Sequence, residues 1–197
     1  MRLILASGSA TRAALLASAG VKFTTQPSRI DERVVEAPLL AAAVPPGDIA
    51  AALAEEKAFD VSRREQGALV IGADQTLDLA GELVTKPRDN AAAREQVARL
   101  AGHTHRLHSA VAIADDGTVV WRNVQSATLA MRTLSAADID SYIAAAGDAV
   151  TASVGGYQVE SLGIRLFDSI EGDHSTILGL PLLPLLKYLR ERAVLPW

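Results

Sequence analysis

The feature that most constrains the fold is residues 68–74, ALVIGAD, in which an unbroken apolar run ends on a carboxylate. A short apolar run predicts a buried strand, and residues 76–85 then alternate around Ala80–Gly81, which predicts a hairpin. Burying a carboxylate is costly unless it is paired, hydrogen-bonded or metal-bound. Asp74 at the end of this strand is therefore either a functional group in a cleft or a structural partner for a turn amide or a lysine, and this stretch leaves both open.

The rest of the chain predicts a mixed α/β fold with a largely antiparallel, elongated sheet flanked by helices. Residues 2–6 form a short strand pattern, followed by a helix that Ser9 caps and Gly20 ends. Strand patterns over residues 105–114 and 118–132 are joined by a turn at Asp115–Asp116–Gly117, which predicts a long antiparallel ribbon.

Further helices are expected between these strands. Asp48 is expected to cap a helix reaching about Ser62, and Asn90 one reaching Ala101. Ser135 with Asp138 resembles a capping box, and residues 181–194 fit a final helix. Residues 34–48, which contain Pro38, Pro45 and Pro46, are expected to be an irregular connection. No repeat or linker divides the chain, so we expect one domain over residues 1–197, long enough for two lobes around a cleft.

Composition excludes several classes of protein. The net charge is −4, from 19 basic and 23 acidic residues, so binding to a long nucleic acid is not expected. Without cysteine there is no disulfide framework, Cys-ligated zinc or thiol nucleophile. The apolar start is too short for a signal peptide, and no segment approaches the roughly 20 apolar residues of a membrane span. We therefore expect a cytoplasmic protein without membrane partners.

Several polar residues are candidates for chemistry. The segment ASGSATR, residues 6–12, joins a strand to a helix, where backbone N–H groups and Arg12 would suit a phosphate, although a capped turn is favoured when the segment is taken alone. Lys86 precedes a proline that restricts its backbone. Carboxylates that could supply oxygen ligands for Mg²⁺ are Asp31, Glu32, Asp74 and Glu160.

Three nearby histidines do not match a zinc site. His105 and His108 would point to opposite faces of a strand, and no carboxylate stands at ligand spacing. With His103, they are expected to be surface or capping residues.

Eight segments resemble, in order and at about the same spacing, the Maf-type nucleoside triphosphate pyrophosphatases. The resemblance covers nearly the whole chain, and the eight weak segments are specific when they occur together. They are LILASGSATRAALLASAG, IDE, LAEEKA, VIGADQT, GELVTKP, LAGHTHRLHSAVAI, VGGYQVESLGI and ILGLPL.

The resemblance implies an enzyme that hydrolyses a nucleoside triphosphate to the monophosphate and pyrophosphate and so cleans the nucleotide pool. It also implies a divalent metal, Mg²⁺ or Mn²⁺, a fold similar to the inosine-triphosphate pyrophosphatases and, in many members, a homodimer. The alternative is a non-catalytic nucleotide-binding regulator of cell division or septum formation.

The resemblance also implies roles for single residues. Asp74 matches the base that activates water, directly or through the metal, and Glu32 with Asp74 matches the metal-binding positions. The matching phosphate-binding positions are Ser7, Ser9, Arg12, Lys57 and Lys86.

Three positions, Thr11, Gln75 and Glu160, match residues that face the base. Gln75 and Glu160 resemble the residues of the branch acting on 7-methyl-GTP, and a carboxylate can accept from both N1–H and the exocyclic amine of guanine.

Two departures from the family pattern affect the expected substrate. The helix-starting proline and one arginine are missing, and Thr11 replaces a tryptophan whose cation–π contact with a charged base is worth about 1 to 2 kcal/mol. Unmethylated GTP or other nucleotides are therefore also expected substrates.

Overall fold

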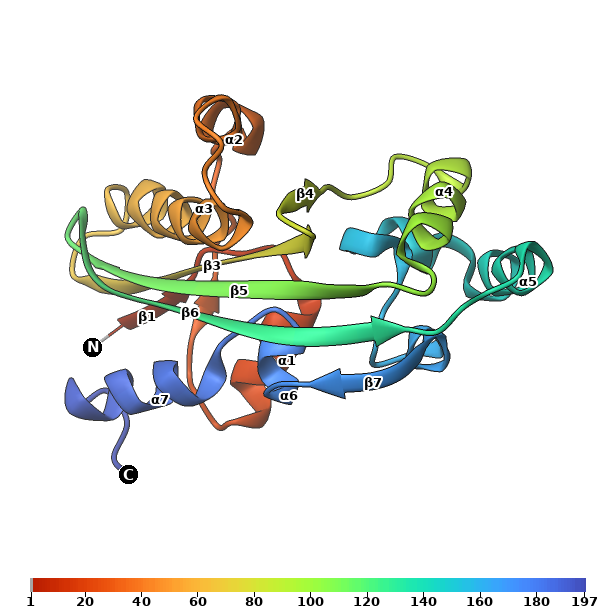
Figure 1. Ribbon diagram of the computed structural model, residues 1–197. Helices are drawn as coiled ribbons and strands as arrows, with labels where there is room; N and C mark the ends of the chain where they lie inside the picture. Colours follow the sequence, from red (N-terminus) through yellow and green to blue (C-terminus); the bar gives the residue numbers. More distant parts are fainter. Residues whose placement is uncertain (1) are drawn as a thin grey trace.

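The computed structural model describes residues 2–197, whose strands form a single sheet (Figure 1). The strand order is β2-β1-β3-β5-β6-β7, with β4 on the edge of β3. Only β1 pairs in parallel, with β2 and β3, and every other pairing is antiparallel. The expected mixed α/β fold is therefore confirmed. The strands are β1 Arg2–Leu5, β2 Thr24–Thr25, β3 Ala68–Leu79, β4 Glu82–Val84, β5 Thr104–Asp115, β6 Thr118–Met131 and β7 Phe167–Glu171.

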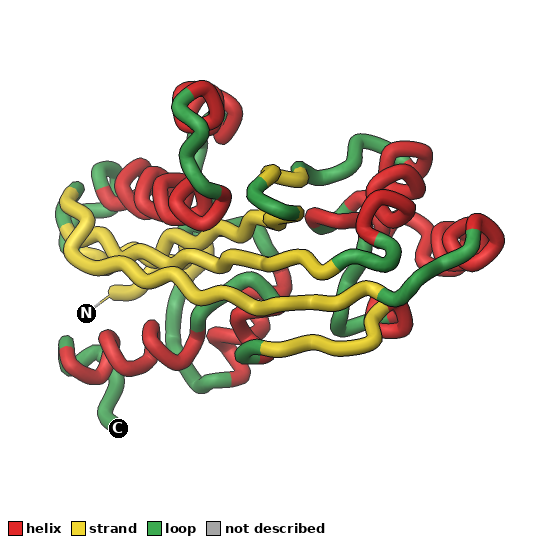
Figure 2. Tube along the Cα trace, viewed as in Figure 1, coloured by secondary structure: helices red, strands yellow, loops and turns green. Residues whose placement is uncertain are grey.

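Helices cover both faces of the long strands and one end of the sheet (Figures 1 and 2). Helix α3 lies on one face, α1, α6 and α7 lie on the other, and α4 and α5 stand at the far end. None of the helices within residues 2–197 combines the length and apolar character needed to cross a membrane. The α-helices are α1 Ala10–Ser18, α2 Glu32–Ala41, α3 Pro46–Ser62, α4 Asn90–Leu100, α5 Ala136–Ala146, α6 His174–Ile177 and α7 Leu182–Glu191, and the 3₁₀ helices are η1 Gly147–Thr151, η2 Val154–Gly156 and η3 Leu162–Leu166.

Several local predictions are confirmed. Ser9 caps α1 by accepting from the Arg12 N–H, and both halves of the Ser135–Asp138 capping box are present. The ribbon of β5 and β6 turns at Asp116 and Gly117, both with positive φ. Each of these features depends on residues within a few positions of one another, which is why the sequence reveals them.

Two helix starts were predicted at the wrong residue. Helix α3 begins at Pro46, because proline is already suited to the first helical position, and Asp48 lies in the first turn without acting as the cap. Helix α4 is capped by Asp89, whose carboxylate accepts from the Ala92 N–H at 2.8 Å, and not by Asn90.

The prediction of an irregular connection over residues 34–48 was wrong, because α2 occupies much of it. Asp31 caps this helix, and Pro38 lies inside it. A proline removes one helical hydrogen bond, but none of the residues of α2 is buried, so water can hydrate the carbonyl left without a donor. In Figure 1, α2 stands apart from the sheet beyond α3.

Strand β3 does not end at Asp74, as predicted, but continues to Leu79. The pairing with β1 stops at Ile71, and β4 begins opposite Leu77. Residues 72–76 of β3 therefore have no partner strand on that edge. This unpaired edge places Asp74 beside an opening while β5 continues to support the strand from the other side.

Close packing of α3 on β3 brings a lysine to this edge. A Cβ on Gly72 would lie 2.0 Å from the Ala54 carbonyl oxygen, so only glycine permits the approach. Small side chains of α3 and β5 complete the contact, namely Ala50, Ala54, Ala58, Ala110, Ala112 and Ala114. Lys57 lies on this buried stripe of α3, next to Ala58.

Candidate active site

All ten side chains predicted for the site line one cleft of about 1,210 Å³. The cleft lies along the unpaired edge of β3 and is bordered by α1, α2 and the segment of residues 152–160. The ten are Ser7, Ser9, Thr11, Arg12, Glu32, Lys57, Asp74, Gln75, Lys86 and Glu160. Residues from both ends of the chain therefore meet in this cleft.

A lysine joins two carboxylates at the base of the cleft. The Lys57 Nζ donates to Asp74 Oδ1 at 2.5 Å and lies 2.7 Å from Glu32 Oε1. Lys57 and Asp74 are both buried, whereas Glu32 is exposed. A buried charge is tolerated when it is paired, so this contact explains how a carboxylate stands inside a core strand.

Arg12 connects three parts of the chain. Its Nη1 donates to the Ala73 carbonyl at 2.9 Å, at the unpaired edge of β3, and to Ser7 Oγ at 3.3 Å. Its Nε donates to the Gly179 carbonyl at 2.8 Å. Burial lowers the pKa of Arg12, while the charges of Asp74 and Glu32 act in the opposite direction.

The turn between β1 and α1 is held by its serines. Ser7 is buried and its Oγ accepts from the Ser9 N–H at 3.2 Å, while the Ser9 Oγ accepts from the Arg12 N–H at 3.3 Å. The capped turn is therefore present, and it places the N-terminus of α1 at the cleft.

The remaining predicted residues lie around the cleft. Lys86 and Glu160 are exposed, and Thr11 is half-buried on α1. Gln75 is half-buried, and its Nε2 donates to Ser109 Oγ at 3.0 Å and to the carbonyls of Ile177 and Thr176 at 3.0 and 3.2 Å. The cleft therefore has a buried end with Arg12, Lys57 and Asp74 and an exposed rim.

A family model described as Maf-like protein matches residues 2–192. The chain belongs to the Maf family. It is 53% identical over 190 residues to the 7-methyl-GTP pyrophosphatase of Brucella abortus biovar 1 (strain 9-941), covering 96% of each chain. It is 51% identical over 193 residues to the nucleoside triphosphate pyrophosphatase of Rhodopseudomonas palustris (strain BisB18), covering 98% of this chain and 95% of the relative.

A solved structure, that of the Staphylococcus aureus Ham1 protein, is similar over 67% of this chain and 71% of its own. The TM-score is 0.35 and the identity 12%, a likeness too weak to carry an argument.

Several cleft residues of this Maf-family chain were not predicted from the sequence, among them Arg29, Arg33 and Glu36. Glu36 lies one helical turn after Glu32 on α2 and also lines the cleft. Burial raises the pKa of Glu36, and the nearby charges of Glu32 and Asp74 raise it further. Asp31 followed by Glu32 is a helix-start signal, and it marks the first turn of α2, on which Glu32 and Glu36 lie.

The donor chemistry at the base of the cleft fits a hard divalent cation. Mg²⁺ typically takes one or two protein carboxylates and completes its shell with water and substrate phosphates. Asp74 and Glu32 supply two carboxylates, and because Lys57 contacts Asp74 Oδ1 and Glu32 Oε1, a metal would use the oxygens that Lys57 leaves free. Residues 2–197 contain no group of three or more His, Cys, Asp or Glu side chains arranged to hold a metal by themselves. A metal at this site would therefore depend on oxygen ligands from the substrate or water.

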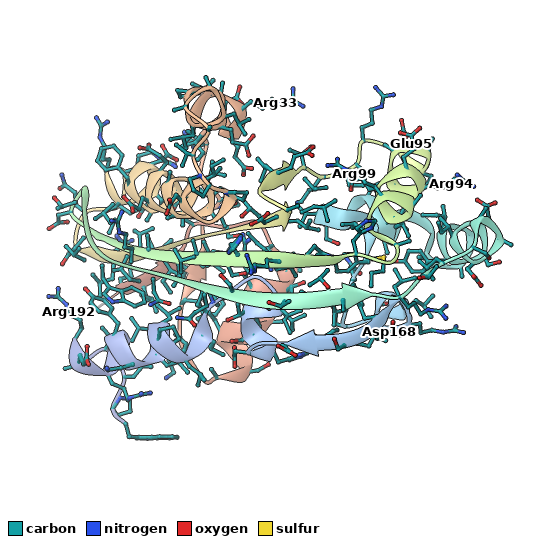
Figure 3. All side chains as sticks on the ribbon, in the orientation of Figure 1. Arg33, Arg94, Glu95, Arg99, Asp168 and Arg192 are labelled. Atoms are coloured by element: carbon teal, nitrogen blue, oxygen red, sulfur yellow. The ribbon has the colours of Figure 1, made fainter. Side chains whose placement is uncertain are left out.

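Several cations outside the cleft are paired at the surface. Arg99 contacts Glu82, Arg94 contacts Asp140 and Arg192 contacts Asp115. Figure 3 shows Arg94 and Arg99 at α4 and Arg192 at the opposite end of the molecule.

One histidine differs from expectation. His105 is a core residue and not a surface residue, because it lies on the buried face of β5 with Leu107. Its Nε2 shares a 2.6 Å hydrogen bond with the Tyr157 hydroxyl. Tyr157 is almost wholly buried and packs edge-on against Phe167, so its ring is part of the core beneath the cleft.

Proposed function

We propose that this protein hydrolyses a nucleoside triphosphate between the α and β phosphates, releasing a nucleoside monophosphate and pyrophosphate. The observation that carries the proposal is the meeting of Asp74, Lys57 and Arg12 at the buried end of one cleft. The names of the two bacterial relatives, 7-methyl-GTP pyrophosphatase and nucleoside triphosphate pyrophosphatase, agree with it.

The proposed chemistry follows from the charges. A triphosphate carries about four negative charges, and an in-line attack by water requires the developing charge to be stabilised. Lys57, Arg12 and Lys86 supply three cations, and the Ser7–Ser9 turn supplies hydroxyl and N–H groups at a helix N-terminus. Asp74 is the proposed base, because it is the buried carboxylate in the cleft.

Lys57 is proposed to serve the base and the phosphates together. Its ammonium group now contacts Asp74 and Glu32. The ion pair holds the Asp74 carboxylate at the cleft, where it is proposed to accept a proton from water. The same ammonium has a third N–H that can donate to a phosphate oxygen.

A divalent metal, Mg²⁺ or Mn²⁺, is part of the proposal, with Asp74 and Glu32 as its protein ligands. When bound, such an ion neutralises phosphate charge and polarises the phosphoryl oxygens. Glu36 lies one turn after Glu32 on α2 and adds negative potential around Glu32 and Asp74.

For the base, we propose guanine, and 7-methyl-GTP as one substrate. Glu160 on the exposed rim can accept from the guanine N1–H and amine, and its charge favours a cationic methylated ring. Thr11 has no aromatic ring that could stack on a cationic base. We therefore expect less discrimination between 7-methyl-GTP and GTP than in an enzyme with tryptophan at this position.

The test is incubation with 7-methyl-GTP, GTP, UTP and dTTP in the presence of Mg²⁺ or Mn²⁺, followed by identification of products. Monophosphate with pyrophosphate is the expected result. Nucleoside diphosphate with phosphate would show that the bond between the β and γ phosphates is cleaved instead. Binding without turnover would favour a non-catalytic regulator of cell division or septum formation.

Three further elements belong to the proposal. We place the enzyme in the cytoplasm, because its proposed substrates belong to the nucleotide pool. We also propose that residues 1–197 act as one domain and assemble as a homodimer. Sedimentation of the purified protein tests the assembly, since a monomer at working concentration would exclude the dimer.

A further inference from the structure

Three side chains outside the cleft form one hydrogen-bonded chain. The Ser126 Oγ lies 2.7 Å from His108 Nδ1, and His108 Nε2 lies 3.2 Å from Asp78 Oδ2. None of these three residues lines the cleft. A hydroxyl, an imidazole and a carboxylate in this order are the arrangement that activates a serine for attack on an acyl group.

The sheet brings the three residues onto one face. His108 on β5 is directly opposite Ser126 on β6 and Thr76 on β3. Asp78 follows Thr76 by two residues, and side chains two positions apart in a strand point to the same side. The arrangement is therefore built on three neighbouring strands and not on a loop.

The contact with Asp78 determines which nitrogen of His108 carries the proton. A carboxylate accepts, so in a neutral ring Nε2 donates to Asp78 and Nδ1 is left as an acceptor. Ser126 then donates its hydroxyl proton to Nδ1. The other carboxylate oxygen, Asp78 Oδ1, accepts from the Gly81 N–H at 2.6 Å, which holds the carboxylate in place. Asp78 thus orients His108 as a base for Ser126.

Burial separates the base from the nucleophile. The side chains of His108 and Asp78 are 14% and 13% exposed, whereas Ser126 is exposed. The serine hydroxyl can therefore be reached from solution while its base is shielded from water. Val124, two residues before Ser126 on the same face of β6, is 36% exposed and offers an apolar neighbour for a short acyl group.

Helix α3 supplies a donor beside the base. A Cβ on Gly47 would lie 3.4 Å from His108 Nδ1, so the first turn of this 17-residue helix contacts the imidazole. The Asp48 and Ile49 N–H groups donate to the Pro45 carbonyl, whereas the Gly47 N–H has no backbone acceptor among residues 2–197. A free N–H at the positive end of a helix suits the oxygen on which charge develops during acyl transfer.

We propose that Ser126, His108 and Asp78 form a second active site, which hydrolyses esters of short carboxylic acids. Ser126 is the nucleophile and His108 the base, and Asp78 is a positioning residue that acts through His108. This activity goes beyond the proposed nucleotide hydrolysis, and the three residues that carry it lie outside the cleft.

The reaction follows from the hydrogen bonds. As the Ser126 Oγ bonds to the ester carbonyl carbon, its proton passes to His108 Nδ1 and the carbonyl oxygen takes the negative charge. The carbonyl re-forms when the bond to the alcohol oxygen breaks, and the departing alcohol takes the proton from Nδ1. Water then attacks the acyl-serine in the same way, which releases the carboxylic acid and returns a proton to Ser126.

The first test is labelling with a fluorophosphonate, which reacts with activated serines, followed by peptide mass spectrometry. The label is expected on Ser126, and Ser126→Ala should abolish it. Ser141→Ala is the matched control and should keep the label, because Ser141 is also exposed but donates to the Ala137 carbonyl and not to a histidine. An unlabelled wild-type protein, or a label on another serine, would overturn the proposal.

Hydrolysis of p-nitrophenyl acetate measures the reaction itself, with Ser126→Ala as the background. His108→Gln should lower the rate above this background by about 100-fold, the lower end of what a general base contributes. Asp78→Asn should lower it as well, because an amide can donate to Nε2 and so leave the proton of the ring on Nδ1. A wild-type rate in either variant would contradict the assigned roles.

Nitrogen-15 NMR of the His108 ring separates positioning from a purely structural role. At the pH of the assay, the wild-type spectrum should show the proton on Nε2, and that of Asp78→Asn should show it on Nδ1. A wild-type ring that carries a proton on Nδ1 would make Ser126 an acceptor only and would sink the proposal.

The outcome is distinguishable from that of the proposed function. Ester turnover with a label on Ser126, but without hydrolysis of any nucleotide, would support the second site and exclude the pyrophosphatase function. Pyrophosphate release from a nucleotide without a label on Ser126 would overturn the second site and leave the proposed function in place.

Discussion

Lys57 and Asp74 form a buried ion pair, with 2.5 Å between the lysine Nζ and the aspartate Oδ1. The two residues come from α3 and β3, which approach closely because Gly72 has no side chain. Glu32 on α2 reaches the same ammonium group at 2.7 Å. The Lys57 ammonium group thus links α2, α3 and β3 at the buried end of the cleft.

Asp74→Asn should abolish turnover and leave the fold intact. The amide has nearly the same shape but cannot take a proton from water, and loss of a general base typically costs about 10²- to 10⁴-fold in rate. The measurement is pyrophosphate release, with circular dichroism to check folding. Asp78→Asn, on the same strand but outside the cleft, should retain activity. Full activity in Asp74→Asn would remove this residue from the mechanism.

Removal of divalent metal by a chelator should stop turnover, and Mg²⁺ or Mn²⁺ should restore it. Glu32→Gln should weaken Mn²⁺ binding, measured by electron paramagnetic resonance without substrate turnover. The loss should be at least the roughly 10- to 100-fold that removal of an outer-shell partner costs. Glu56→Gln, an exposed glutamate outside the cleft, is the control, and equal Mn²⁺ affinity in both variants would argue against Glu32 as a ligand.

Glu160→Gln should shift the nucleotide preference from guanine toward uracil or thymine. The variant loses an acceptor for the guanine N1–H and amine but gains a donor for a pyrimidine carbonyl, and one bidentate base contact is worth roughly tenfold or more in discrimination. The ratio of kcat/KM for GTP and UTP measures the shift. Glu171→Gln, on the exposed part of β7, should leave the ratio unchanged. An unaltered ratio in Glu160→Gln would exclude Glu160 from base recognition.

Stability should fall in mild acid because of His105. Burial lowers the pKa of His105 to about 4, below its ordinary value of 6.5. At pH 7 the histidine is neutral in both folded and unfolded chains, whereas between pH 6.5 and 4 the unfolded chain binds a proton that the folded chain does not. The free energy of unfolding should therefore decrease as the pH falls through this window, by about 3 kcal/mol in all.

Urea unfolding from pH 7 to pH 4 measures this loss. His105→Phe should flatten the profile, because the ring remains while the titrating group is gone. His103→Ala, at an exposed position, should leave it unchanged. A profile in His105→Phe as steep as in the wild-type protein would assign the acid sensitivity to other groups.

Local features of the fold were predictable from the sequence, and those fixed by distant contacts were not. The β5–β6 turn and the Ser135 cap depend on neighbouring residues only. The predicted end of the strand at Asp74 was wrong, because the opening beside it arises where β1 stops at Leu5, far away in the sequence.

The same reasoning applies to the cleft. The ten residues identified through the resemblance to Maf proteins all line the cleft, but the resemblance did not reveal Glu36, which belongs to none of the eight segments. Lys57 carried a usable signal, because it continues the buried stripe of α3 after Leu53 and Ala54. His105 did as well, since it alternates with Leu107 on β5, but its partner Tyr157 lies 52 residues away.

The continuous strands also determine how the cleft can respond to a ligand. Strands β3 and β5 run without a break from the hydrophobic cluster beneath α7 to the cluster beneath α4. A hinge across the sheet would have to break this ladder of hydrogen bonds, so the base of the cleft is mechanically stiff. Adaptation to different nucleotides must come from its borders, chiefly α2, which no buried side chain anchors and which Glu32 ties to Lys57.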